Sequence, residues 1–141
     1  MTSVTSARVA APVGQFPHAR RVGNLLFLSG IGPRIRGSKT IPGVTFDDEG
    51  NVLAKDIVAQ CHSVFANVRA ILEDAGARWE HLVDVTVFLT DMKTDFDAYN
   101  QLWAEYFPEA PPCRTTVEVN RLPTPIAIEI KCIAEMPEEA S

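Results

Sequence analysis

The sequence of 141 residues lacks the short patterns that most often mark a metal or cofactor site. It has 3 cysteines and 3 histidines, and none of them stand in CxxC, HxxxH or HxxE spacing. A zinc site or a dithiol redox centre is therefore not indicated. No phosphate-binding P-loop, no GxGxxG and no GxSxG occurs either, so nucleotide binding and a serine nucleophile elbow are not indicated. We expect no metal and no cofactor.

Long apolar runs and an excess of positive charge are also missing. No stretch approaches the ~20 apolar residues that cross a bilayer, and the first residues lack the apolar core of a signal peptide. The formal net charge is -5, with 13 Lys and Arg against 18 Asp and Glu, which suits a phosphate backbone poorly. We expect a cytoplasmic protein with reduced thiols and neither a nucleic acid nor a membrane as partner.

The sequence does contain enough apolar residues, 46%, for one sizeable core in a single domain spanning residues 1–141. We expect residues 1–12 to form a loose N-terminal arm and residues 137–141 a loose tail. Phe16 to Val22 and Leu25 to Gly30, joined at Gly23-Asn24, predict an opening hairpin. The stretch from Arg34 to Asn51 predicts a long loop or a short extra hairpin.

The rest of the pattern predicts two helices and three further strands. Apolar residues at helical spacing predict helices over 54–75 and 93–107, and alternation predicts strands over 82–90, 113–119 and 126–134. The last two strands, separated by the turn residues Leu122 to Pro125, predict a second hairpin. This order predicts an α+β fold in which two helices pack on one face of a mixed β-sheet. The other face is mixed in polarity, which is typical of a surface covered by another subunit.

Arg114 is the strongest candidate for a ligand-binding residue. It stands where a strand leaves a proline-rich loop, and a planar guanidinium offers two parallel N–H donors to a carboxylate. The structural alternative is a sheet-edge salt bridge to Glu118 or Glu129. Both interpretations remain open at this point.

Glu129 stands among isoleucines, where a carboxylate is costly unless it has a partner or a function. Arg114, Lys131 or a water molecule would have to satisfy it. A partly desolvated carboxyl group is a plausible proton carrier, and the alternative is a side chain that points to solvent at a sheet edge. For Cys113, packing in the core is favoured over a nucleophilic role, because no histidine lies near it in the sequence.

Four stretches together resemble a known family: LLFLSG, DVTVFLTDM, PPCRTTVEVNRLP and IEIKCIA. They are similar to the Rid (RidA-like) enamine/imine deaminases, over residues 12–136. The opening GQFPHARRVGNLLFLSG and the long loop after it look like 2-aminomuconate deaminase within that family. The resemblance implies a chorismate-mutase-like fold, a homotrimer with a central barrel, and clefts between adjacent subunits.

The resemblance also implies roles for individual residues. Arg114 would hold the carboxylate of a small substrate, the backbone at Gly30 and Ile31 would assist it, and Glu129 would position the attacking water. Other residues would line the cleft, namely Ser29, Asn100, Cys113 and Phe16, the last at a position where many members have tyrosine. A second substrate carboxylate would be met by one of five basic residues: His18, Arg20, Arg21, Arg34 or Arg36. For any single one of them the alternative, a place in a solvated basic stretch, remains equally open.

The activity implied is hydrolysis of an enamine or imine to a 2-oxo acid and ammonia without a cofactor. The subgroup implies 2-aminomuconate as substrate, 4-oxalocrotonate as product, and a place in aromatic catabolism. The alternatives are a general 2-imino acid deaminase and a non-enzymatic, ligand-binding or chaperone-like member of the family.

Overall fold

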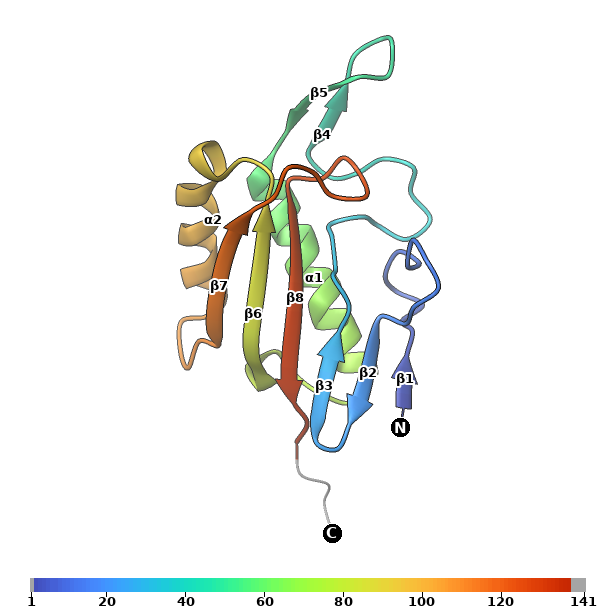
Figure 1. Cartoon of the computed structure of the whole chain (residues 1–141), viewed down its shortest axis with the longest axis vertical. Helices are drawn as coiled ribbons and strands as arrows, with labels where there is room; N and C mark the ends of the chain where they lie inside the picture. Colours follow the sequence, from blue (N-terminus) through green and yellow to red (C-terminus); the bar gives the residue numbers. More distant parts are fainter. Residues whose placement is uncertain (1, 138–141) are drawn as a thin grey trace.

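The computed structural model describes residues 2–137, and its centre is a six-stranded mixed sheet with both long helices on one face (Figure 1). The strand order is β1-β2-β3-β8-β6-β7, in which β6 and β7 are parallel and the other neighbours are antiparallel. This confirms the α+β prediction. Apart from Pro137, the predicted tail at 137–141 lies outside the described residues.

The bounds of the elements follow the chain. The strands of the main sheet are β1 Thr2–Val4, β2 Ala19–Val22, β3 Leu25–Leu28, β6 Leu82–Leu89, β7 Cys113–Glu118 and β8 Ile128–Glu135. A separate hairpin is formed by β4 Val44–Phe46 and β5 Val52–Lys55. The helices are α1 Ile57–Asp74 and α2 Met92–Tyr106, with a short 3-10 turn at Trp79–His81.

Helix α1 supplies most of the helical half of the core. Its N-cap is Asp56, whose side chain accepts a hydrogen bond from the Val58 N–H at 2.9 Å. The predicted apolar stripe is buried, including Cys61, Val64, Phe65, Val68, Ile71 and Leu72. The helix begins later than predicted because β5 pairs with β4 up to Lys55. The stretch from Arg34 to Asn51 thus contains β4, one strand of a short extra hairpin. Such a hairpin was one of the two alternatives predicted for this stretch.

The predicted hairpin between 113–119 and 126–134 is wrong. Strand β6 lies between β7 and β8, and the chain from 119 to 127 crosses the end of β6 to connect them. This connection is longer than the roughly two to five residues of a hairpin loop. Alternation in the sequence predicts which face of the sheet a side chain is on, but not which strands are neighbours. Burial explains the observed order. Every second residue of β8 is buried, which suits a strand inside the sheet, whereas no residue of β7, the edge strand, is fully buried.

The face of the sheet away from the helices is only partly polar. Phe27, Val83 and Val117 are 36%, 43% and 37% exposed, and Phe88 and Ile133 are half-buried on the same face. A register shift between Leu82 and Asp84 takes Val83 off the buried face that Val85 and Val87 share. An apolar patch of this kind is typical of a protein interface.

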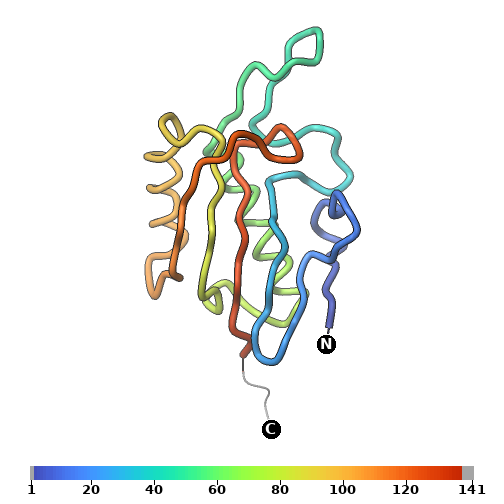
Figure 2. The backbone as a smooth tube through the Cα atoms, viewed as in Figure 1, coloured from blue at the N-terminus to red at the C-terminus, as the bar shows by residue number. Residues whose placement is uncertain are grey.

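The N-terminal segment is not a loose arm, contrary to the sequence-based prediction. Strand β1 pairs with β2, and the chain after it returns beside the loop that follows β3 (Figure 2). The buried His18, which precedes β2, holds this N-terminal segment in place. Its Nδ1 accepts from the Ser6 N–H and its Nε2 donates to the Ala10 carbonyl, both at 2.9 Å. Arg36 adds a bond to the Val9 carbonyl at 2.9 Å. These contacts have no sequence signature, because the partners are backbone atoms, which composition does not reveal.

Replacing His18 by leucine should therefore destabilise the protein without touching a reacting group. Two buried backbone groups would lose their partners, a cost of about 2 to 4 kcal/mol in the free energy of unfolding. Denaturant unfolding measures the change. Arg8→Ala is the control, since the contacts of Arg8, ion pairs with Glu73 and Asp74 and a bond to the Ala70 carbonyl, are exposed and their loss should cost less. Equal effects of the two changes would contradict the role assigned to His18.

Candidate functional site

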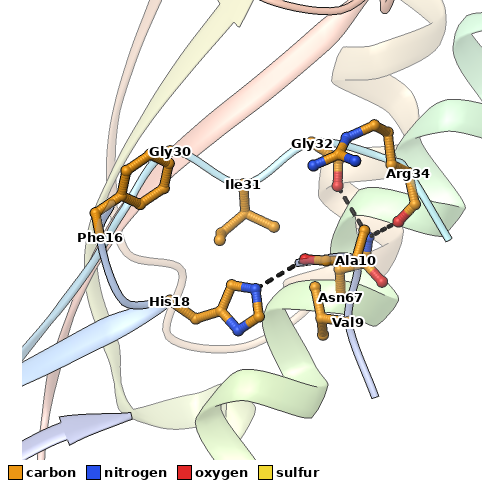
Figure 3. A pocket seen from close by; sticks show the side chains of 9 residues that line it. All are labelled: Val9, Ala10, Phe16, His18, Gly30, Ile31, Gly32, Arg34 and Asn67. Carbon is orange, nitrogen blue, oxygen red and sulfur yellow. Dashed lines mark hydrogen bonds between the residues drawn. The ribbon is translucent and has the colours of Figure 1, made fainter. Parts of the chain in front are cut away.

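A cleft of about 230 Å³ opens beside Glu129, at the end of the sheet where β3 leaves it. We call it the Glu129 cleft. It is lined by residues from the N-terminal segment, the turn after β3 and the loop before β8, namely Val13, Phe16, Gly30, Gly32, Arg34, Pro123, Thr124, Ile126 and Glu129. A smaller cavity, whose lining Figure 3 shows, adjoins it and shares four residues with it, namely Phe16, Gly30, Gly32 and Arg34.

Glycine at position 30 allows the backbone to approach the carboxylate. A Cβ at Gly30 would lie 3.0 Å from the Glu129 carboxyl carbon and 3.1 Å from Oε2, closer than ordinary contact. The Gly30 N–H also makes no hydrogen bond with any described residue. A carboxyl group and an unused amide therefore face the same cleft.

Glu129 itself has no polar partner within the described chain. Lys131, its expected neighbour, donates instead to the Leu28 carbonyl at 2.8 Å, and Arg114 is in no ion pair. Burial raises the pKa of the Glu129 carboxyl group above its usual value. Such a group exchanges protons closer to neutral pH than an exposed glutamate, which suits a proton carrier.

The turn after β3 is held rigidly by α1. The buried Asn67 donates from Nδ2 to the carbonyls of Gly32 at 2.9 Å and Arg34 at 2.8 Å (Figure 3). Ser63 donates to the Pro33 carbonyl at 2.7 Å. Arg34 in turn donates from Nη2 to the Ala11 carbonyl at 2.9 Å. These bonds fix the wall of the Glu129 cleft on the scaffold of the core.

Two of the residues expected to bind substrate have polar groups that are already used. Both ring nitrogens of His18 bond to backbone, so none is left for a substrate carboxylate. The Ile31 N–H donates to the Ile130 carbonyl at 2.8 Å, which excludes it as a free donor. The ligand contacts expected for His18 and for the Ile31 N–H are therefore wrong. Of the two expected backbone donors, only the Gly30 N–H remains available to a substrate.

Arg114 lies elsewhere, under helix α2. Its guanidinium carbon is 5.1 Å from the ring centre of Tyr99 and 5.0 Å from that of Trp103, within the range of cation–π contact. Its Nη1 is buried and has no acceptor among the described residues. Burial raises the pKa of Tyr99, whose hydroxyl bonds to Thr116 at 2.7 Å, so the phenol stays neutral beside the cation. The result is a stacked cation with an unused donor.

Arg114 and Glu129 of one chain therefore do not meet. Arg114 is paired with the buried Val85 and faces the helices, whereas Glu129 is paired with Phe88 and faces away from them. Strand geometry separates them by about 10 Å along the strands and about 10 Å across them. The salt bridge that was the structural alternative for Arg114 is absent from the described residues.

The remaining expected residues, Asn100, Ser29 and Cys113, lie outside the Glu129 cleft. Asn100 is exposed on α2, next to Tyr99, and lies on the Arg114 side. Ser29 donates to the Pro17 carbonyl at 2.8 Å and does not line the Glu129 cleft. Cys113 begins β7 on the face opposite Arg114 and is exposed, so the core position predicted for it is wrong.

Three contributors were missed by the sequence reasoning. Asn67 carries a detectable signal, because it is a polar residue inside the apolar stripe of α1. Tyr99 and Trp103 lie on the buried side of α2, but their contact with Arg114 depends on the β6–β7 pairing and carries no sequence signal. The described residues contain no group of three or more metal-ligating side chains. No helix in the described part is long and apolar enough to cross a membrane.

Comparison with known proteins fits this geometry. Residues 6–136 match the family model described as endoribonuclease L-PSP. The chain belongs to that family. A RutC family protein of Pyrococcus abyssi is 37% identical over 132 residues, covering 93% of this chain and 94% of the relative. The resemblance to the Rid family is thereby confirmed at the level of the family.

Two further relatives carry more informative names. The chloroplastic Reactive Intermediate Deaminase A of Arabidopsis thaliana is 32% identical over 133 residues, covering 94% of this chain and 65% of the relative. The structure of Escherichia coli TdcF with bound serine aligns with a TM-score of 0.82 and 27% identity, covering 97% of this chain and all (100%) of that one. The match in fold extends over both the Glu129 cleft and the Arg114 side.

The burial of Glu129 predicts a pH dependence of stability. A carboxyl group whose folded-state pKa is raised weakens the fold above that pKa, and the penalty disappears as pH falls toward the unfolded value near 4.5. Glu129→Gln should therefore be at least as stable as the parent at neutral pH, and the difference should vanish in acid. Thermal unfolding between about pH 4 and 8 measures this. This expectation holds for the single chain; a variant that is less stable at neutral pH would mean that a cation from another copy, such as its Arg114, faces Glu129 in an assembly.

Proposed function

We propose that the protein is a deaminase that hydrolyses the C=N bond of a 2-imino acid, formed from an enamine, to a 2-oxo acid and ammonia. The relative named reactive intermediate deaminase supports this reaction class. Within the class we propose 2-aminomuconate as the substrate, 4-oxalocrotonate as the product and a role in aromatic catabolism. The acidic net charge of -5 continues to argue against RNA as a substrate.

The observation that carries the proposal is the placement of Arg114 and Glu129 on opposite faces of one sheet. Neither half is a complete site: Arg114 has an unused donor and Glu129 an unpaired carboxyl group. A homotrimer in which the Arg114 side of one copy closes over the Glu129 cleft of the next would complete the site. The apolar open face of the sheet, with Phe27 and Val117, supports association between copies.

In the proposed mechanism Arg114 holds the substrate carboxylate with its planar pair of N–H donors. The enamine shifts a proton to carbon and becomes the imine. Glu129 takes a proton from water as the water oxygen bonds to the imine carbon, and it passes that proton to the imine nitrogen. The resulting carbinolamine expels ammonia as its hydroxyl becomes the carbonyl of the 2-oxo acid. Position and one desolvated carboxyl group supply the catalysis.

Arg34 is the residue we propose for a second substrate carboxylate. Among the five basic residues considered, it alone combines a place in the wall of the Glu129 cleft with N–H groups beyond the one that bonds to Ala11. His18 is fully bonded, Arg36 donates to the Ser6 and Val9 carbonyls, and Arg20 and Arg21 lie on β2. A dicarboxylate would then extend from Arg114 of one copy to Arg34 of the next.

Subunit mixing tests the composite site. Arg114→Lys loses the planar fork and should reduce kcat/KM by about 30- to 1000-fold, and Glu129→Gln should reduce kcat by about 10²- to 10⁴-fold. When the two variants are unfolded together and refolded at equal amounts, about a quarter of the sites in a random trimer combine both parent residues. About a quarter of the parent activity should return, measured as ammonia released from a freshly generated imine.

The control for that experiment is the double variant Arg114→Lys/Glu129→Gln refolded with itself, which has no parent site to restore. If the mixture recovers no activity although each variant is folded and oligomeric by sedimentation, Arg114 and Glu129 of different copies do not act together in one site. A monomer in sedimentation would remove the composite site altogether.

The role of Arg34 has its own test. Arg34→Met should lower kcat/KM for a dicarboxylic imine by about 10- to 100-fold and leave a monocarboxylic imine within about twofold, because only the former needs the second cation. Arg36→Met is the matched control, since Arg36 bonds to backbone and does not line the cleft. Equal losses on both substrates would assign Arg34 to holding the N-terminal segment rather than to specificity.

A further inference from the structure

A second cavity, of about 380 Å³, lies between the β4–β5 hairpin, the start of α2 and the loop that precedes β8. This volume is within the range of about 300 to 1,000 Å³ typical of small-ligand sites. We call it the hairpin cavity. Figure 1 shows the hairpin projecting beyond the sheet, with the start of α2 and the loop before β8 at its base. The cavity shares no lining residue with the Glu129 cleft.

The hairpin cavity contains a carboxylate without a partner. Asp95 is only 7% exposed, lines the cavity, and makes no hydrogen bond or ion pair with any described residue through its side chain. A buried charge in that state is costly unless something outside the chain compensates it. Burial and the nearby Asp91 raise the pKa of Asp95 above its usual value.

The other charged groups around Asp95 are already engaged. Asp56 and Asp91 cap α1 and α2 through bonds to backbone N–H groups at 2.9 Å and 3.2 Å. Lys55 donates to the Ile126 carbonyl at 3.4 Å. The thiol of Cys61 has a pKa raised to about 12 by burial and stays uncharged. Asp91 and Asp95 line the cavity beside Lys55, its one ammonium, and Asp56 adds a further negative charge that acts on Asp95, so the balance favours a cation as the missing partner.

The walls of the cavity further restrict what that cation can be. Thr90, Thr94 and Asn120 offer oxygens that can accept N–H donors, while Leu53 presents an exposed apolar side chain. A primary ammonium group has three N–H donors, enough for one carboxylate and two such oxygens. A short alkyl chain would cover the apolar wall.

We propose that the hairpin cavity binds a small aliphatic molecule through its primary ammonium group, with Asp95 as the charged acceptor. The site is separate from the proposed deaminase site and does not depend on that activity. It uses the β4–β5 hairpin, which makes no strand pairing with the main sheet and has no other assigned role.

The experiment is a titration of the full chain with n-butylammonium chloride, followed by the backbone amide signals of an NMR spectrum. Saturable shifts should concentrate at residues 52–55, 90–95, 120 and 127. Asp95→Asn, which keeps the shape and removes the charge, should weaken binding by about 10- to 100-fold. The matched control Asp97→Asn removes an exposed acid of the same helix that does not line the cavity, and should leave binding unchanged.

A second variant distinguishes a charge effect from damage to the fold. Lys55→Gln removes the one cation of the cavity and should tighten n-butylammonium binding, in the direction opposite to Asp95→Asn. Sodium butyrate at equal ionic strength should produce no saturable shifts at these residues. The proposal is overturned if the parent shows none with n-butylammonium, if Asp95→Asn binds within about twofold of the parent, or if butyrate binds equally well.

Discussion

A single β-sheet separates the guanidinium of Arg114 from the carboxyl group of Glu129, and the functional architecture depends on that separation. Because side chains alternate along a strand, Arg114 follows Val85 toward α2 whereas Glu129 follows Phe88 to the opposite face. No rotamer change can bring one through the sheet to the other. A reaction that needs both must therefore recruit them from different copies of the chain, which makes oligomerisation a requirement of the proposed chemistry.

The two half-sites are stabilised by different forces. Arg114 is held by the aromatic rings of Tyr99 and Trp103, which fix the plane of the guanidinium without using up its donors. The Glu129 cleft is held by a chain of backbone-directed bonds that runs from Asn67 through the turn after β3 to Arg34 and the N-terminal segment. Each half is thus preorganised within one chain, so that in the proposed oligomer association would only have to bring them together.

The sequence was sufficient for the fold class because its signals are local: the stripe of α1 and the alternation of β6 appear directly as burial. It failed where the outcome depends on which strands become neighbours, as in the hairpin wrongly predicted for β7 and β8. The candidate site likewise has one part that local sequence signals predict and one part that depends on tertiary structure. Arg114 and Glu129 could be singled out from residue type, but the backbone bonds that occupy His18 and Ile31 depend on tertiary pairing and have no local signature.

Glu129 and Asp95 present the same physical problem, a carboxyl group whose pKa is raised mainly by burial. Their surroundings differ in a way that separates their roles. Glu129 faces an amide and has no acidic neighbour that perturbs it, so that gaining and losing a proton is its accessible response. Asp95 stands among other carboxylates at the start of a helix, whose dipole favours the ionised form, and a cation that enters the cavity lowers the electrostatic cost of all of them at once. Burial alone therefore does not define the function of a carboxylate in this fold; the charge of its neighbours does.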